Sequence, residues 1–106
     1  MTILTDLGIA ALRDGVAKGE FSARDVALAF NDAVAGAKAL NAFIVETPNH
    51  ALAAADAADK DRASGTLKPL SGVPIGMKDL FATQGVQTTA ASHMLEGFTP
   101  QYESTV

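Results

Sequence analysis

The sequence has no cysteine, no tryptophan and only one tyrosine among its 106 residues. The absence of cysteine excludes disulfides, thiolate nucleophiles and cysteine-based zinc sites, and it favours a reducing compartment, so we expect a cytoplasmic protein. No stretch approaches the roughly 18 consecutive apolar residues that suggest a membrane span. The opening residues, MTILTD, also lack the basic patch and apolar core of a secretory signal. We therefore expect neither a membrane anchor nor secretion.

Basic residues are few and scattered. Eight Lys and Arg stand against twelve Asp and Glu, which gives a net charge of −4. Proteins that bind nucleic acid directly concentrate Lys and Arg on one face, so we expect no direct nucleic-acid contact by this segment. The GxxxxGK[ST] frame of a phosphate-binding loop is also missing. We predict no metal site and no cofactor in this chain.

The composition changes abruptly near residue 65. Residues 1–65 are rich in alanine, whereas glycine and proline divide residues 66–106 into short pieces. We therefore predict a helical segment over 1–65 and a second, less regular segment over 66–106.

The helical segment should contain three helices. We expect the first over residues 6–18, with Thr5 as N-cap, Gly19 as the stop, and one apolar face made by Ile9, Leu12 and Val16. A compact apolar run over 40–47 is interpreted as a strand or a buried turn.

Capping residues mark the other two helices. Ser22 followed by Asp25 predicts a capping box at the start of the second helix, whose core face would be Val26, Phe30, Ala33, Val34 and Ala37. Thr47 followed by Pro48 predicts the start of the third, which should stop at Ser64–Gly65. The core face of the third helix would comprise Leu52, Ala55 and Ala58.

The second segment shows a pattern typical of strands. The apolar residues Val73, Ile75 and Met77 alternate with Pro74, Gly76 and Lys78, and residues 86–89 are β-prone. On that alternation Lys78 shares a face with Gly76, whose missing side chain would let a backbone or a ligand approach the amine. The alternative is that Lys78 and Asp79 form an exposed pair at a sheet edge, and the spacing alone is compatible with both. Met77, Met94 and Phe98 are expected in the core.

Several stretches resemble the amidase signature family. GVPIGMKDLFATQGVQTTAAS, residues 72–92, is similar to the family block G-[IV]-P-[IVF]-[GA]-[IVM]-K-D followed by a glycine and T-T-x-x-S. GEFSARDVALAF, LNAFI and LEGFTPQYESTV resemble three further passages of the family, so the likeness extends from about residue 7 to residue 106. Within the family, the arrangement is most similar to the glutamine-hydrolysing subunit of tRNA-dependent amidotransferases.

The resemblance implies an α/β fold. This chain would be the N-terminal part of an α/β/α sandwich around a mixed sheet, with three helices, one or two short strands, and residues 66–106 as the start of the catalytic core. A strand near 73–81 whose neighbours come later in the sandwich would have unpaired edges here. We therefore expect the isolated chain to self-associate or to keep only its helical half well ordered.

The resemblance also implies which residues carry the chemistry. Lys78 matches the lysine of the family's Ser–cis-Ser–Lys triad, and Asp79 would orient Lys78 or cap a turn. Both serines belong to a GGSSGGS-like block that is not found in these residues, so this chain alone is predicted to be inactive. Thr88, Thr89 and Ser92 are candidates for the substrate cleft, although β-propensity and turn capping would explain them as well.

A lysine can act as a base only where burial disfavours its ammonium form, and Ile75 and Met77 are apolar neighbours of the kind that would bury Lys78. The implied reaction is the deamidation of glutamine through an acyl-enzyme. The ammonia would pass to a partner subunit that uses ATP and Mg²⁺ to amidate Glu-tRNA(Gln) or Asp-tRNA(Asn), in a complex with subunits B and C. The alternatives are an amidase of the same family acting on other small amides, and a non-catalytic helical module for association.

Overall fold

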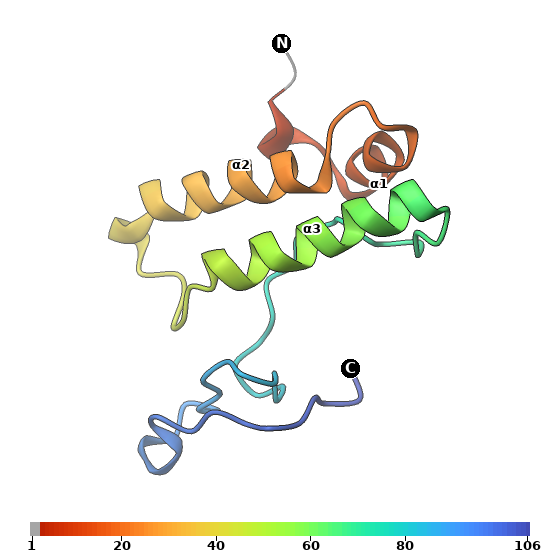
Figure 1. The fold of residues 1–106 in the computed structure, drawn as a ribbon. Coiled ribbons are helices and arrows are strands. Elements are labelled where there is room, and N and C mark those ends of the chain that lie inside the picture. The colour runs from red at the N-terminus through yellow and green to blue at the C-terminus, as the bar shows by residue number, and fades with distance from the viewer. Residues whose placement is uncertain (1–2) are drawn as a thin grey trace. The chain divides into compact units, whose positions relative to one another are not determined.

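The computed structural model describes residues 3–106, which form three α-helices joined by loops and short 3₁₀ turns (Figure 1). The helices are α1 (Ile9–Lys18), α2 (Ala23–Gly36) and α3 (Pro48–Ser64). The 3₁₀ turns are Leu4–Asp6, Lys38–Leu40 and His93–Leu95. The chain divides into two compact units: a helical unit made of residues 3–42 and 48–74, and a loop unit made of residues 43–47 and 75–106.

Local capping residues set most helix ends. Gly19 ends α1 in the left-handed conformation, with φ of 75°, as predicted. The predicted start of α1 is wrong, because Thr5 lies in a 3₁₀ turn, the chain is extended at Leu7, and Gly8 is the N-cap.

The capping box at the start of α2 is confirmed. The Ser22 hydroxyl accepts a hydrogen bond from the Asp25 backbone N–H at 2.9 Å, and the Asp25 carboxylate accepts one from the Ser22 N–H at 3.2 Å. Helix α3 begins at Pro48 and ends at Ser64, also as predicted.

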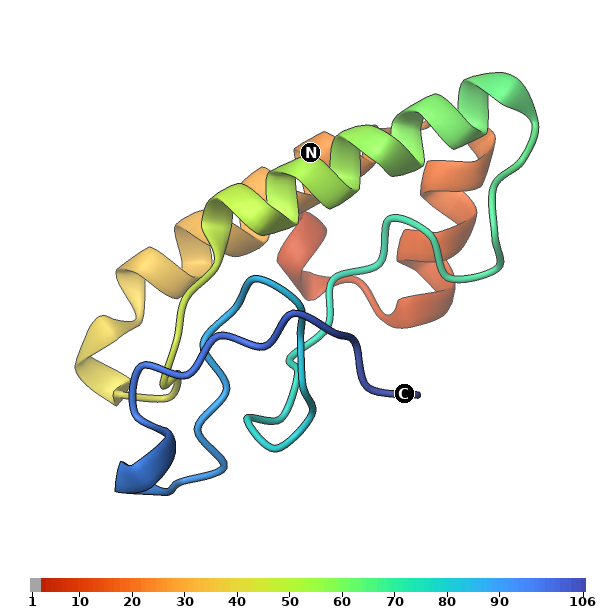
Figure 2. The same ribbon diagram turned by 60° about the horizontal axis from the view of Figure 1, so that its bottom comes forward.

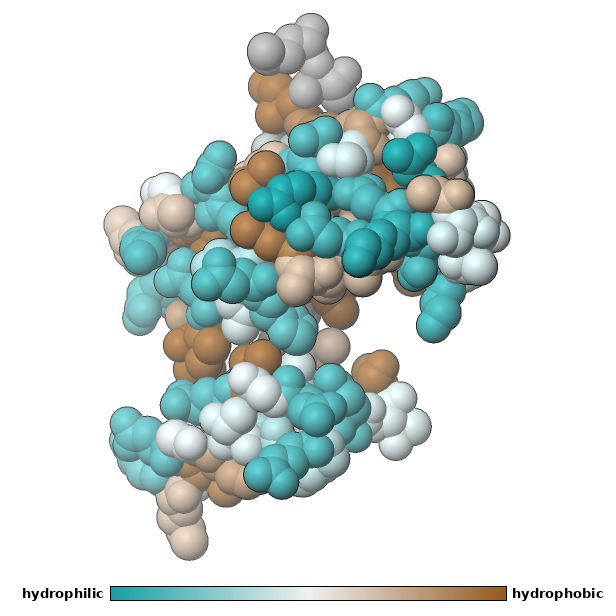
Figure 3. Space-filling view, in the orientation of Figure 1, coloured by the Kyte–Doolittle hydropathy of each residue, from teal (hydrophilic) through white to brown (hydrophobic). Residues whose placement is uncertain are grey.

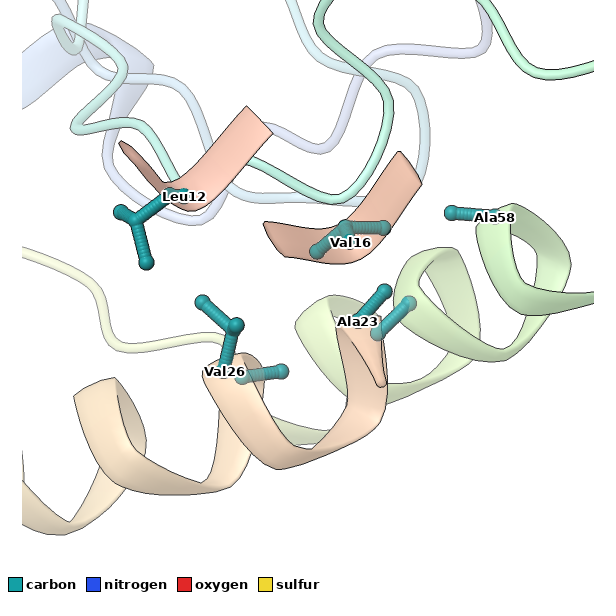
Figure 4. Packing of buried hydrophobic residues seen from close by; sticks show 7 residues of the cluster. Leu12, Val16, Ala23, Val26 and Ala58 are labelled. Carbon is teal, nitrogen blue, oxygen red and sulfur yellow. The ribbon is translucent and has the colours of Figure 1, made fainter. Parts of the chain in front are cut away.

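The core of the helical unit lies where the three helices meet. Helices α2 and α3 run side by side in opposite directions (Figures 1 and 2). Leu12 and Val16 on α1 face Val26 on α2, and α3 adds small side chains to the same cluster (Figure 4). The buried members of this cluster are Leu12, Val16, Ala23, Val26, Ala27, Ala55 and Ala58.

Four of the residues predicted for this core lie outside it: Ile9, Ala33, Val34 and Ala37. Ile9 is 64% exposed and Ala33 is exposed, whereas Ala27 on α2 is buried. The later start of α1 accounts for Ile9, because it is the first residue of the helix and precedes the turn that packs. Only the N-terminal half of α2 contributes fully buried residues.

The predicted strands over 73–81 and 86–89, and the strand interpretation of 40–47, are not found. Residues 3–106 contain no β-strand, and the only bridge among them is the isolated pair Thr83–Val86. The physical reason is the lack of a partner: across residues 3–106, no backbone carbonyl accepts from the N–H groups of residues 75–78. Apolar alternation favours a strand, but a strand needs a second segment with which to pair.

The loop unit has almost no apolar core. Its buried residues are Thr88, Thr89 and Pro100. Met77, Met94 and Phe98, which were predicted to be buried, are 46%, 94% and 40% exposed. Large apolar side chains therefore remain at the surface, where Figure 3 shows brown hydrophobic patches.

Candidate functional site

Lys78 lies in the loop unit at the start of a tight turn. Its carbonyl accepts a hydrogen bond from the Phe81 N–H at 3.1 Å, while its side chain is exposed. Ile75 and Met77 are themselves 74% and 46% exposed. The apolar surroundings expected for a lysine base are therefore not supplied by residues 3–106.

The backbone at Gly76, two residues before Lys78, borders open space. A Cβ atom added at Gly76 would meet nothing within 4 Å. None of the three ion pairs among residues 3–106 includes Lys78, so the pairing with Asp79 that the sequence left open is absent. The amine is thus accessible and has no acidic partner in the described part of the chain.

Asp79 binds Thr89 instead. One carboxylate oxygen accepts a hydrogen bond from the Thr89 backbone N–H at 3.0 Å, and the other accepts a short one from the Thr89 hydroxyl. The Asp79 carbonyl also accepts from the Ala90 N–H at 3.0 Å. Through these hydrogen bonds, Asp79 links the Lys78 turn to the segment that contains Thr89 and Ala90.

These bonds set the electrostatics of Asp79. The Thr89 hydroxyl, and after it the Thr89 backbone N–H, hold the pKa of the Asp79 carboxyl below its ordinary value. Hydrogen bonds to the charged form stabilise the carboxylate, which is why the pKa falls. Asp79 is accordingly an anion at neutral pH whose acceptor oxygens face Thr89.

The other two candidates for the substrate cleft bond locally. The Thr88 hydroxyl donates to the Val86 carbonyl at 3.1 Å, and the Ser92 hydroxyl accepts from the Met94 N–H at 3.2 Å as it caps a 3₁₀ turn. Thr88 and Thr89 are each only 7% exposed. Lys78, Thr88, Thr89 and Ser92 thus share the loop unit, where Thr89 bonds to the residue next to the lysine. A role in a substrate cleft stays a prediction.

Two hollows in the described part of the chain are lined by residues of the helical unit alone, and neither includes Lys78. No group of three or more His, Asp or Glu side chains lies close enough to hold a metal ion in this range. Within the same residues, no helix combines the length and the apolar character needed to cross a bilayer.

Comparison with known proteins identifies the family. The profile of the Amidase family matches residues 25–106, which include the Lys78 turn and Thr89. The chain belongs to the amidase family. All 106 residues also align, at 74% identity, with the A subunit of the glutamyl-tRNA(Gln) amidotransferase of Rhizorhabdus wittichii and with that of Sphingopyxis alaskensis. The corresponding protein of Zymomonas mobilis is 63% identical over 106 residues.

This amidase chain spans about a fifth of the length of the curated relatives it matches, 21% and 22% for the first two. A solved structure gives the same proportion. It is described as "An unexpected vestigial protein complex reveals the evolutionary origins of an s-triazine catabolic enzyme", in an inhibitor-bound complex. It matches 92% of this chain and 22% of its own chain, with a TM-score of 0.84 and 35% identity.

Sequence reasoning missed how Asp79 and Thr89 are paired, although it named both residues. The aspartate of K-D and the second threonine of T-T-x-x-S lie ten residues apart, and nothing in that spacing selects Thr89 over Thr88 as the partner. The only available signal was the family block itself, which contains both residues.

Proposed function

We propose that this chain is the lysine-bearing part of the glutamine-hydrolysing subunit of a tRNA-dependent amidotransferase. The observation that carries the proposal is the 74% identity over all 106 residues with the A subunit of glutamyl-tRNA(Gln) amidotransferases. The K-D dipeptide at Lys78 and Asp79 lies inside the region that matches the Amidase family.

In the proposed mechanism, Lys78 is the base of a Ser–cis-Ser–Lys triad. Its neutral amine takes a proton from the cis-serine, which takes the proton of the nucleophilic serine as that hydroxyl attacks the amide carbon of glutamine. The C–N bond then breaks, the proton passes to the departing nitrogen, and ammonia leaves behind a glutamyl ester. Water cleaves the ester to release glutamate and restore the serine.

The proposal needs more protein than residues 1–106. Both serines would lie in the remaining four fifths of the subunit, which would also bury Lys78 and supply strands that pair with residues 73–81 in an α/β/α sandwich. Burial matters because a lysine in water is held as its ammonium, which has no lone pair to accept a proton. Burial disfavours the ammonium and so favours the neutral amine. We therefore assign Lys78 its catalytic role only within the complete subunit.

The partners follow from the same proposal. Ammonia would pass to a second subunit, which would use ATP and Mg²⁺ to activate the carboxyl group of Glu-tRNA(Gln) or Asp-tRNA(Asn), within a cytoplasmic complex that includes subunits B and C. The nucleic acid and the nucleotide would thus be bound by partners. This assignment agrees with the scattered basic residues and net charge of −4 of this chain.

A second candidate function is the hydrolysis of another small amide. Its support is the likeness, at 35% identity over 92% of the chain, to a solved protein that is described in relation to an s-triazine catabolic enzyme and not to tRNA. The identity with the amidotransferase relatives is about twice as high, 74% against 35%, so we propose glutamine as the substrate.

Ammonia release from a panel of amides tests the proposal. A full-length subunit carrying residues 1–106 is assayed with glutamine, asparagine and short aliphatic amides, with and without the partner subunits and mischarged tRNA. We expect glutamine to be preferred and its hydrolysis to be coupled to amidation of the tRNA. A preference for another amide would support the second candidate, and no hydrolysis of any amide would refute both.

A further inference from the structure

The backbone on the C-terminal side of Lys78 is held at several points within the loop unit. The Lys78 carbonyl accepts from the Phe81 N–H, and the next residue, Asp79, bonds to Thr89 through both carboxylate oxygens and to Ala90 through its own carbonyl. The peptide that joins Lys78 to Asp79 is therefore tied to a segment ten residues away.

The segment to which Asp79 binds is in an unusual conformation. Ala90 and Ala91 have φ of 49° and 60°, in the left-handed region that alanine rarely adopts. Such residues persist only where the surrounding structure determines them. The groups that donate to Asp79 belong to Thr89 and Ala90, so these hydrogen bonds hold the chain where the strained residues begin.

Thr89 is a buried residue whose side chain bonds to another part of the loop unit. It is 7% exposed, and its hydroxyl is directed to Asp79. Lys78 has the opposite character, with an exposed side chain and no acidic partner among residues 3–106. The carboxylate next to the lysine is thus engaged by Thr89 and not by the amine.

We propose that Asp79 is a positioning residue for Lys78 that acts by binding Thr89, not by forming an ion pair with the lysine. The inference rests on the proposed function of Lys78 as a base. A base must be placed accurately relative to the hydroxyl it deprotonates, and a displacement of about 1 Å can lower a rate by about 10²-fold. The bond from Asp79 to Thr89 would provide that accuracy in the backbone that carries the amine.

An ion pair and a positioning bond make different predictions for Thr89. Thr89→Val removes the hydroxyl bond without changing any charge, so it should leave kcat at neutral pH unaltered if Asp79 serves only as a counter-ion. On the positioning account, Thr89→Val lowers kcat by at least about tenfold and leaves KM within about twofold. Thr89→Ser keeps the hydroxyl and should keep most of the activity.

The test uses a full-length subunit carrying residues 1–106, with the variants Thr89→Val, Thr89→Ser, Asp79→Ala and the double variant of Asp79→Ala with Thr89→Val. Thr83→Val is the matched control, because the Thr83 hydroxyl donates to the Phe81 carbonyl at 3.3 Å and does not contact Asp79. Because two residues that act through one bond are not additive, we expect the double variant to be no slower than Asp79→Ala. Hydrogen exchange is measured on the same proteins at the Phe81, Thr89 and Ala90 amides, which donate to Lys78 or Asp79.

In Thr89→Val we expect faster exchange at the Phe81, Thr89 and Ala90 amides and unchanged exchange in α2, which shows that the helical unit is intact. Additive losses, a kcat within twofold of the parent, or a raised KM with unchanged kcat would overturn the inference, the last by making Thr89 a substrate contact. Unchanged exchange at all three of the Phe81, Thr89 and Ala90 amides overturns it whatever the activity. A parent protein that hydrolyses no amide refutes the proposed function, and the exchange data then report on the Asp79–Thr89 bond separately.

Discussion

The carboxylate of Asp59, on α3, accepts a hydrogen bond from the backbone N–H of Ala23, the first residue of α2, at 2.8 Å. Its other oxygen accepts from the Arg24 N–H at 3.1 Å. The first N–H groups of a helix have no partner within the helix and need one from outside. Asp59 supplies two of these acceptors and the Ser22 hydroxyl a third, so α3 completes the N-terminal end of α2.

Asp59→Ala should lower the free energy of unfolding by about 1–2 kcal/mol, the usual cost of losing a helix cap. Asp56→Ala, one turn earlier on α3, is the matched control. It breaks only the half-exposed ion pair with Arg24, and such pairs contribute about 1 kcal/mol or less. Urea unfolding followed by circular dichroism measures both, and equal losses would show that Asp59 is no more than another surface acid.

Gly15→Ala should destabilise the helical unit by about 1–3 kcal/mol, the usual cost of overpacking a core. Gly15 is buried in α1, and a Cβ atom there would collide with the ring of Phe21. Gly36→Ala is the control, because a Cβ atom at that position in α2 would meet nothing within 4 Å. Alanine there should be neutral or stabilise by up to about 1 kcal/mol. A stabilised Gly15→Ala in thermal unfolding would show that Phe21 does not pack on this glycine.

The acid limb of stability should depend on Thr89. Because the pKa of Asp79 is lowered in the folded chain, its stabilising effect is present above the unfolded-state pKa of about 3.9 and is lost as the pH falls through the folded-state value. Thr89→Val removes the largest cause of the lowering, so the Asp79 pKa should rise towards normal. Carboxyl-detected NMR titration checks this against Thr83→Val, and an unmoved Asp79 midpoint would contradict it.

The isolated 106-residue chain should be well ordered in its helical unit and either poorly protected or self-associated in its loop unit. Every member of the apolar core cluster belongs to the helical unit, whereas Ile75, Met77 and Leu80 are exposed in the other. Hydrogen exchange with light scattering tests this expectation. A strict monomer whose amides over 75–80 exchange as slowly as those of α2 would contradict it.

Local signals account for the features that the sequence predicted correctly. Gly19, the Ser22–Asp25 pair and Pro48 act on backbone groups within a few residues, so they identify helix ends from the sequence alone. The bond from Asp59 to Ala23 could not be predicted in this way, because it spans 36 residues and depends on how α2 and α3 pack.

The candidate site also combines residues that the sequence identified with a contact that depends on the three-dimensional structure. The family block identified Lys78, Asp79 and Thr89, but the bond between the last two became visible only in three dimensions. The strand over 73–81 was inferred from apolar alternation and from the family resemblance, and the burial of Lys78 from its apolar neighbours and the needs of a lysine base. Both inferences describe what the segment would do beside a partner. Residues 3–106 provide no such partner, so neither feature forms within the chain.

The central claim is that Lys78 is the base of an amidase, and glutamine-dependent ammonia release tests it most directly. In a full-length subunit carrying residues 1–106, Lys78→Ala should lower turnover by at least about 10²-fold, because the groups of a triad act as a unit, with the melting temperature unchanged. Lys60→Ala, at an exposed position of α3, should leave turnover as it was. If Lys78→Ala retained more than about a tenth of the parent's turnover, a smaller loss than a general base typically accounts for, Lys78 would not be the base.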